Sequence, residues 1–179
     1  MDTSNKVYPP FPILSTKRLT LRRLSIDDAQ KVFILRSDSE INKYLDRQIS
    51  TSFEDAINFI RQVNENIDEN NALYWGITIL DTNKIIGAVS IFNVSIDNEK
   101  CEIGYELLTN FQNQGIMKEA VEKVIDYTFH TKKIKRIEAF LHIKNQRSIN
   151  LLEKLCFKKS TERNETNTEI IGYQLTNSN

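Results

Sequence analysis

The chain has 179 residues, and its 24 Lys and Arg residues balance its 24 Asp and Glu residues at zero formal net charge. This balance, with a sequence pI near 6.7, argues against nucleic-acid binding, because proteins of that class carry a strong basic excess. The hydrophobic share of 40% and the charged share of 27% are ordinary for a soluble globular protein. No run of about 18 apolar residues exists and the N-terminus lacks the layout of a secretion signal, so we expect a cytoplasmic protein without a membrane span.

The length fits a single domain spanning residues 1–179, since domains usually hold about 100–200 residues. Residues 1–15, which contain Pro9, Pro10 and Pro12, predict an extended lead-in, and residues 176–179 predict a frayed tail. The chain has 2 cysteines, which lie far apart and give neither a disulfide framework nor a zinc spacing. We therefore expect no metal site.

The first part of the chain predicts one strand followed by helices. Residues 18–22 alternate polar and apolar side chains, which is the pattern of a strand. Two pairs, Ser25 with Asp28 and Thr51 with Glu54, follow the capping-box spacing that begins a helix. The helices expected from these starts and from apolar periodicity span about residues 25–36, 39–45 and 51–67.

The second part of the chain alternates strands with helices. Residues 81–83 separate two strand-like runs and predict a hairpin, whereas apolar residues recur at helical spacing between residues 114 and 131. Strand–helix–strand alternation indicates a parallel strand pair inside a mixed sheet with helices on both faces. We expect strands at about 73–80, 84–93, 99–108, 136–143, 157–163 and 169–175, and helices at about 114–131 and 147–155.

The junction at residues 107–117 joins a strand to the start of the most strongly patterned helix. Such a junction presents unpaired backbone N–H groups and the positive end of the helix dipole, which together favour an anion. Gly115 would let a phosphate approach the backbone, and Asn113 is suited to a turn with positive φ. On these residues alone, a polar loop that merely caps a helix remains the alternative.

Several blocks of this chain resemble the RimJ/RimL branch of the GNAT superfamily of acyltransferases. Gln112-x-x-Gly115-x-Met117 resembles the Gln/Arg-x-x-Gly-x-Gly/Ala signature that binds the pyrophosphate of acetyl-CoA, although Asn113 stands where this branch usually has Gly. Further blocks that resemble the branch, in the same order along the chain, are residues 16–22, 102–107, 115–120 and 145–157.

The resemblance implies the GNAT fold, an α/β fold with a central, mixed and mostly antiparallel sheet of six to seven strands. Helices cover both faces of that sheet, and one parallel strand pair is splayed. The resemblance also implies acetyl-CoA as cosubstrate without a metal, and homodimer formation stays open. The residues that would bind acetyl-CoA are Leu107, Leu108, Gln112, Asn113, Gln114, Gly115, Ile116, Met117 and Asn145.

The implied reaction is direct transfer of the acetyl group to an amine in a ternary complex, which needs positioning and proton transfer but no covalent enzyme nucleophile. Glu102 is the candidate general base, because a polar residue between Cys101 and Ile103 in a covered strand needs a reason. Glu106 lies on the same strand face as Glu102, about 13 Å away. Because Glu106 falls where the family's strand splays, we favour Glu102 as the base. The alternative is that Glu102 only forms an ion pair at the rim of the sheet. Ser148 would return the proton to the thiolate or cap a helix.

The acceptor is expected to be the N-terminal α-amine of a protein. An α-amine is roughly 10% neutral at pH 7, against about 0.04% for a lysine, so a weaker base is enough to deprotonate it. Characterised members of the RimJ/RimL branch acetylate protein N-termini, notably of ribosomal proteins. Two alternatives stay open: a small-molecule amine such as an amino acid, polyamine or antibiotic, and a CoA-binding module without catalysis.

Overall fold

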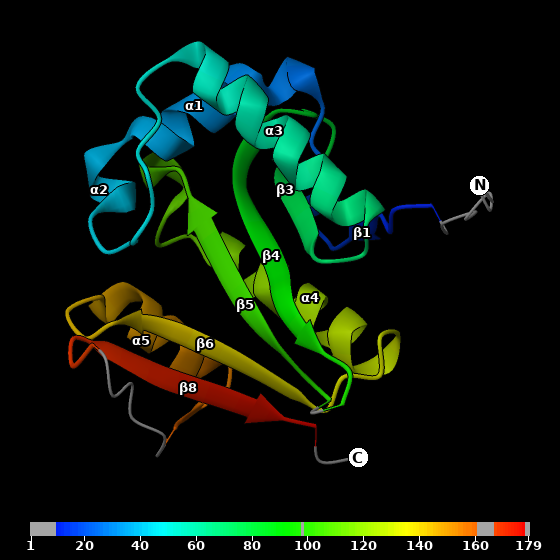
Figure 1. Cartoon of the computed structure of the whole chain (residues 1–179), viewed down its shortest axis with the longest axis vertical. Helices are drawn as coiled ribbons and strands as arrows, with labels where there is room; N and C mark the ends of the chain where they lie inside the picture. The colour runs from blue at the N-terminus through cyan, green and yellow to red at the C-terminus, as the bar shows by residue number, and fades with distance from the viewer. Residues whose placement is uncertain (1–9, 98, 161–166, 178–179) are drawn as a thin grey trace, which may run out of the picture.

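The computed structural model describes residues 10–97, 99–160 and 167–177, which form one mixed sheet covered by helices on both faces (Figure 1). Helices α1 and α3 pack on one face, and α4 and α5 lie on the other. The strands are β1 (Leu14–Ser15), β2 (Leu19–Arg22), β3 (Leu73–Ile79), β4 (Ile85–Ser95), β5 (Lys100–Leu107), β6 (Arg136–His142), β7 (Lys158–Lys159) and β8 (Ile170–Thr176), in the sheet order β1-β2-β3-β4-β5-β6-β8-β7. The helices are α1 (Ala29–Ser37), α2 (Ser39–Asn42), α3 (Phe53–Asp68), α4 (Ile116–His130) and α5 (Gln146–Lys154), with 3-10 turns η1 (Ile26–Asp28) and η2 (Thr109–Phe111).

The sheet has eight strands rather than six or seven, because the segment predicted as a lead-in contributes one. Leu14 pairs with Leu21 to form β1, and the carbonyl of Pro12 accepts a hydrogen bond of 2.8 Å from the indole N–H of Trp75. Trp75 itself is fully buried, so this contact ties the segment to the core. Residues 1–9 lie outside the described residues.

The predicted tail is also partly wrong. Thr176 is the last residue of β8, and the N–H of Asn177 donates a hydrogen bond of 2.8 Å to the carbonyl of Lys135. The strand predicted over 157–163 is reduced to β7, and residues 161–163 lie outside the described residues, as do 178–179.

The first helix start is as predicted, and the other is shifted by one residue. The carboxylate of Asp28 accepts the backbone N–H of Ser25 at 2.8 Å, which begins η1 and then α1. For α3 the cap is Ser52 with Asp55, not Thr51 with Glu54, because Asp55 reaches the N–H groups of both Thr51 and Ser52. These hydrogen bonds lower the pKa of Asp55 and keep its carboxylate at the positive end of the helix dipole.

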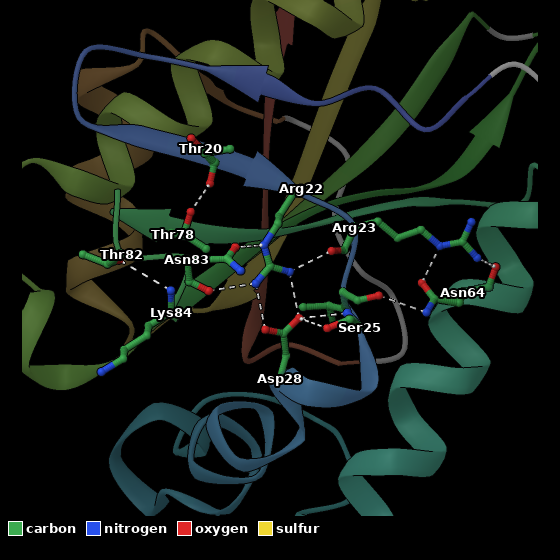
Figure 2. A network of polar contacts seen from close by, with 11 residues as sticks. Thr20, Arg22, Arg23, Ser25, Asp28, Asn64, Thr78, Thr82, Asn83 and Lys84 are labelled. Carbon is green, nitrogen blue, oxygen red and sulfur yellow. Dashed lines mark hydrogen bonds and ion pairs between the residues drawn. The ribbon is translucent and has the colours of Figure 1, made fainter. Parts of the chain in front are cut away.

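Arg22 of β2 connects the sheet to η1, the turn that leads into α1 (Figure 2). Its guanidinium donates to both carboxylate oxygens of Asp28 at 2.8 Å and to the side-chain oxygen of Asn83 in the β3–β4 hairpin at 2.7 Å. The positive φ angles of Asp81 and Asn83 form the tight turn predicted there. One partly buried side chain therefore connects β2, that hairpin and the turn η1 that leads into α1.

The parallel strands β5 and β6 part after a short contact, visible as their divergence in Figure 1. They pair only at Lys100↔Arg136, Cys101↔Ile137 and Glu102↔Glu138. Beyond that point β5 continues beside β4 and β6 continues beside β8. Gly87 of β4 permits this course, because a Cβ there would lie 2.5 Å from the carbonyl oxygen of Glu106.

Candidate functional site

An open cavity of about 620 Å³ lies where β5 and β6 part. It is lined by the last residues of β5, the loop before α4, the start of α5 and residues 40–45 in and after α2. Its volume is in the range of sites for small molecules and cofactors. The parting of two strands thus brings segments from both halves of the chain to one concave surface.

The loop before α4 has the geometry of an anion site. Asn113 and Gly115 adopt positive φ angles of 61° and 73°, and Gly115 is the N-cap of a helix of 15 residues. Within the described residues, no hydrogen bond is made by the backbone N–H groups of residues 113–118. A diphosphate placed at this end of the cavity would receive these N–H groups and the positive helix dipole, so the loop fits the phosphates of coenzyme A.

Most of the predicted cofactor residues lie together. Leu107, Gln112, Asn113, Gly115, Ile116, Met117 and Asn145 line the cavity. Leu108 and Gln114 do not: Leu108 packs in the cluster beneath α1 and α3, and its N–H donates to the carbonyl of Ile86 at 2.9 Å. The N–H of Leu108 therefore already has a partner, Ile86, and is not available for acetyl-CoA.

Gln112 holds the loop rather than pointing freely into solvent. Its side-chain N–H donates to the carbonyl of Leu107 at 3.0 Å, and its side-chain oxygen accepts a hydrogen bond of 2.8 Å from Arg147. Arg147 stands in the first turn of α5. These two contacts join the end of β5, the loop and α5 around the cavity.

The two glutamates of β5 have different surroundings. Glu102 does not line the cavity, and its carboxylate accepts a hydrogen bond of 2.9 Å from Asn93 on β4. Glu106 does line it and is almost fully buried, with 7% of its side chain exposed. Its two oxygens accept hydrogen bonds from the hydroxyl of Tyr74 at 2.8 Å and from Arg47 at 2.5 Å.

The charge of Glu106 organises a buried polar cluster. Burial raises the pKa of Tyr74 well above its ordinary value, and the negative charge of Glu106 adds to this, so the tyrosine stays a neutral donor. The guanidinium of Arg36 packs over the ring of Phe59, 3.8 Å from its centre. The pKa of Arg36 is lowered, mainly by burial and also by the positive charge of Arg47. Sequence reasoning missed Arg47 and Tyr74, since neither belongs to a recognisable motif.

On the opposite face of β5, Tyr105 meets the start of α5. Burial raises the pKa of Tyr105 to about 12, and a hydrogen bond with Ser148 acts in the other direction. The helix cap is Asn145, whose side-chain oxygen accepts the N–H of Ser148 at 3.2 Å. Ser148 is therefore not the cap of α5, and its hydroxyl lies in the cavity beside that of Tyr105.

Tyr105 was not singled out from the sequence. It follows Cys101 and Ile103 at intervals of two residues, so it is expected on the same, core-facing side of the strand. Only its place near the end of the strand could have distinguished it. Among the described residues no grouping of His, Cys, Asp and Glu could hold a metal ion. In the same part of the chain, no helix has both the length and the apolar character needed to cross a membrane.

Comparison with known proteins identifies related chains. Residues 18–158 match the family model described as acetyltransferase (GNAT) domain. The N-acetyltransferase p20 of Bacillus licheniformis is 36% identical over 146 residues, which is 82% of each chain. The ribosomal protein uS5 alanine N-acetyltransferase of Escherichia coli is 35% identical over 98 residues, 54% of this chain and 50% of that protein. A structure of the ribosomal L7/L12 α-N-protein acetyltransferase RimL in complex with coenzyme A superposes with a TM-score of 0.81 at 20% identity, covering 92% of this chain and 98% of that one.

Replacement of Gly115 by valine should weaken acetyl-CoA binding by roughly tenfold or more, because a β-branched residue is strained at positive φ and the loop must move. Titration calorimetry with acetyl-CoA measures the change. Asn113→Gly is the matched control, since glycine accepts the same positive φ and should keep the affinity. An unchanged Kd in a Gly115→Val protein that melts normally would show that this loop does not bind the donor.

Proposed function

The chain belongs to the GNAT acetyltransferase family, and on that premise we propose that it acetylates the N-terminal α-amine of a protein by direct attack in a ternary complex. It is an acetyl-CoA-dependent N-acetyltransferase. The observation that carries the proposal is the cavity at the parted strands, where the loop before α4, the Tyr105–Ser148 pair and the carboxylate of Glu106 share one surface. Acetyl-CoA supplies the activated thioester, and the rest of the chemistry is positioning and proton transfer.

The donor half of the site is formed by the loop and the exposed edge of β5. Backbone N–H groups of residues 113–118 receive the diphosphate. Beyond Glu102, the backbone of β5 that faces β6 has no partner strand there, so it is available for hydrogen bonds with the pantetheine amides. Asn145 uses its side-chain oxygen as a helix cap, which leaves its side-chain N–H₂ group to donate toward the same arm.

Glu106, in place of Glu102, is proposed to receive the acceptor amine. It lines the cavity, whereas Glu102 is on the same face but about 13 Å farther along the strand. Each oxygen of Glu106 already accepts one hydrogen bond, yet a carboxylate has about four acceptor positions, so an ammonium group or a bridging water can still bind. Its role is to hold the amine and remove its proton.

Ser148 and Tyr105 are proposed to return the proton to the thiolate. Because the pKa of Tyr105 is raised to about 12, its hydroxyl keeps its proton across the neutral and mildly alkaline range. The hydroxyl of Ser148 lies beside it and can relay the proton. Donor and acceptor groups therefore reach the reacting atoms from opposite faces of β5.

A protein N-terminus fits the acceptor side for two reasons. Among the described residues that line the cavity, Glu106 and Glu40 are the only carboxylates. So few candidate bases suit an α-amine better than the amine of a lysine side chain, because the α-amine has the lower pKa and is more often neutral. The relative from Escherichia coli is named for acetylating an alanine of a ribosomal protein. Both observations support an α-amine over the side chain of lysine.

The acceptor proposal is tested with a panel of amines. Peptides with a free N-terminus should be acetylated, whereas the same peptides with a blocked N-terminus and an internal lysine should not, and mass spectrometry should place the acetyl group on the α-nitrogen. Free amino acids, polyamines and aminoglycosides provide the comparison. A higher kcat/KM for any of these amines would replace the proposal by a small-molecule acceptor, and no thiol release with any amine would leave a CoA-binding module.

Glu106→Gln should lower kcat/KM by about 10²- to 10⁴-fold, as expected for loss of a general base. The defect should shrink as pH rises above the pKa of the amine, because the acceptor then loses its proton without help. Glu102→Gln is the matched control on the same strand and face, and should behave like the unmodified enzyme. The pH–rate profiles of both variants measure this, and the reverse result would return the role of base to Glu102.

Tyr105→Phe should lower kcat by about a hundredfold while leaving the Kd of acetyl-CoA unchanged, since the ring stays and only the proton donor is lost. Steady-state kinetics and calorimetry separate the two quantities. Tyr127→Phe serves as control, because Tyr127 packs edge-on against Trp75 in the core. A Tyr105→Phe enzyme with normal kcat would remove this hydroxyl from the proton path.

A further inference from the structure

Arg18 contacts the loop before α4. It precedes β2 and does not line the cavity. Its guanidinium donates a hydrogen bond of 3.1 Å to the carbonyl of Gln114, and another of its nitrogens lies 3.5 Å from where a Cβ of Gly115 would be. The side chain thus supports the loop at the residue that has positive φ.

Arg18 is itself held in place by Glu119 in the first turn of α4. Its Nε donates to one carboxylate oxygen at 2.6 Å, its backbone N–H donates to the other at 3.0 Å, and the hydroxyl of Thr16 donates to that second oxygen as well. Partial burial acts to raise the pKa of Glu119, but the hydrogen bonds from Thr16 and Arg18 outweigh it and lower the pKa. The carboxylate stays charged, so the bridge between β2 and α4 is maintained at neutral pH.

The carbonyl and the N–H of a trans peptide point in opposite directions, and the described chain has no cis peptide. Since the carbonyl of Gln114 points to Arg18, the N–H of Gly115 points away from it. We propose that Arg18 is a positioning residue, which orients the Gln114–Gly115 peptide so that the N–H of Gly115 faces the diphosphate of acetyl-CoA. The inference rests on the proposed function in one respect, that the loop binds the donor, and is independent of the acceptor.

The requirement is for arginine specifically. The planar guanidinium reaches the carboxylate of Glu119 with Nε and the carbonyl of Gln114 with Nη1 in one rigid fork. A lysine carries a single ammonium group and can keep the ion pair with Glu119, but it cannot fix both partners in one plane. Ion pairing alone therefore should not restore the orientation of the peptide.

The test compares two donors, one with and one without the diphosphate. In Arg18→Gln, calorimetry without acceptor should show acetyl-CoA binding weakened about tenfold, the scale of freeing one backbone unit. The same calorimetry with S-acetylpantetheine, which lacks the diphosphate, should give an unchanged Kd. Arg18→Lys should melt like the unmodified protein yet bind acetyl-CoA as weakly as Arg18→Gln.

Arg23→Gln is the matched control, because Arg23 follows the same strand and its guanidinium pairs with Asp68 at 2.7 and 2.8 Å on the helical side. This variant removes the same charge and an ion pair, and should keep the Kd of acetyl-CoA. Equal losses with both donors in Arg18→Gln would indicate general damage and overturn the proposal. A normal Kd of acetyl-CoA in Arg18→Gln would also overturn the proposal for Arg18. If Gly115→Val still weakens binding in that case, the loop remains the acetyl-CoA site. If Gly115→Val also binds normally, the proposed acetyl-CoA site fails together with the role of Arg18. A negative acceptor panel does not affect this result.

Discussion

The early end of pairing between β5 and β6 is the constraint on which the site depends. Each strand keeps its antiparallel neighbour, β4 for β5 and β8 for β6, and the two pairs diverge after Glu102. Unpaired backbone groups are costly when buried, so an opening of this kind is stable only where water or a ligand reaches it. The gap therefore exposes main-chain donors and acceptors inside an otherwise continuous sheet, and the cavity forms at that place.

The parted strand also lets neighbouring residues serve two substrates. Side chains alternate between the faces of a strand, so Tyr105 turns toward α5 and the donor, whereas Glu106 turns toward the cluster of Tyr74 and Arg47. In a fully paired sheet these two faces would be separated by the backbone layer. Here the opening connects them, so the acid and the base proposed above reach one cavity.

The sequence predicted the order of strands and helices along the chain, the parallel pair and the turn before α4, because these depend on local periodicity and on a glycine and an asparagine that do adopt positive φ. It did not predict β1, a strand of two residues that pairs with β2 and follows a hydrogen bond between Pro12 and the distant Trp75. The splay at position 106 was the reason to prefer Glu102, whereas the structure places Glu106, and not Glu102, in the cavity that this splay opens. The contacts of Arg18, Arg47 and Tyr74 join distant parts of the chain. Arg18 and Glu119, for example, are 101 positions apart, and no local pattern marks such contacts.

The donor and acceptor halves are fixed by different segments, and this has a consequence for specificity. The loop before α4 is supported by Arg18 in the turn before β2, by Glu119 of α4 and by Arg147 of α5. Glu106 is supported through Arg47, whose Nε donates to the side chain of Asn42, which in turn donates to the carbonyl of Leu35 at the end of α1. Any acceptor that moves α2 therefore also moves the partner of the proposed base. In the proposed function, residues 40–47 therefore couple the choice of amine to its deprotonation, through segments other than those that support the loop before α4.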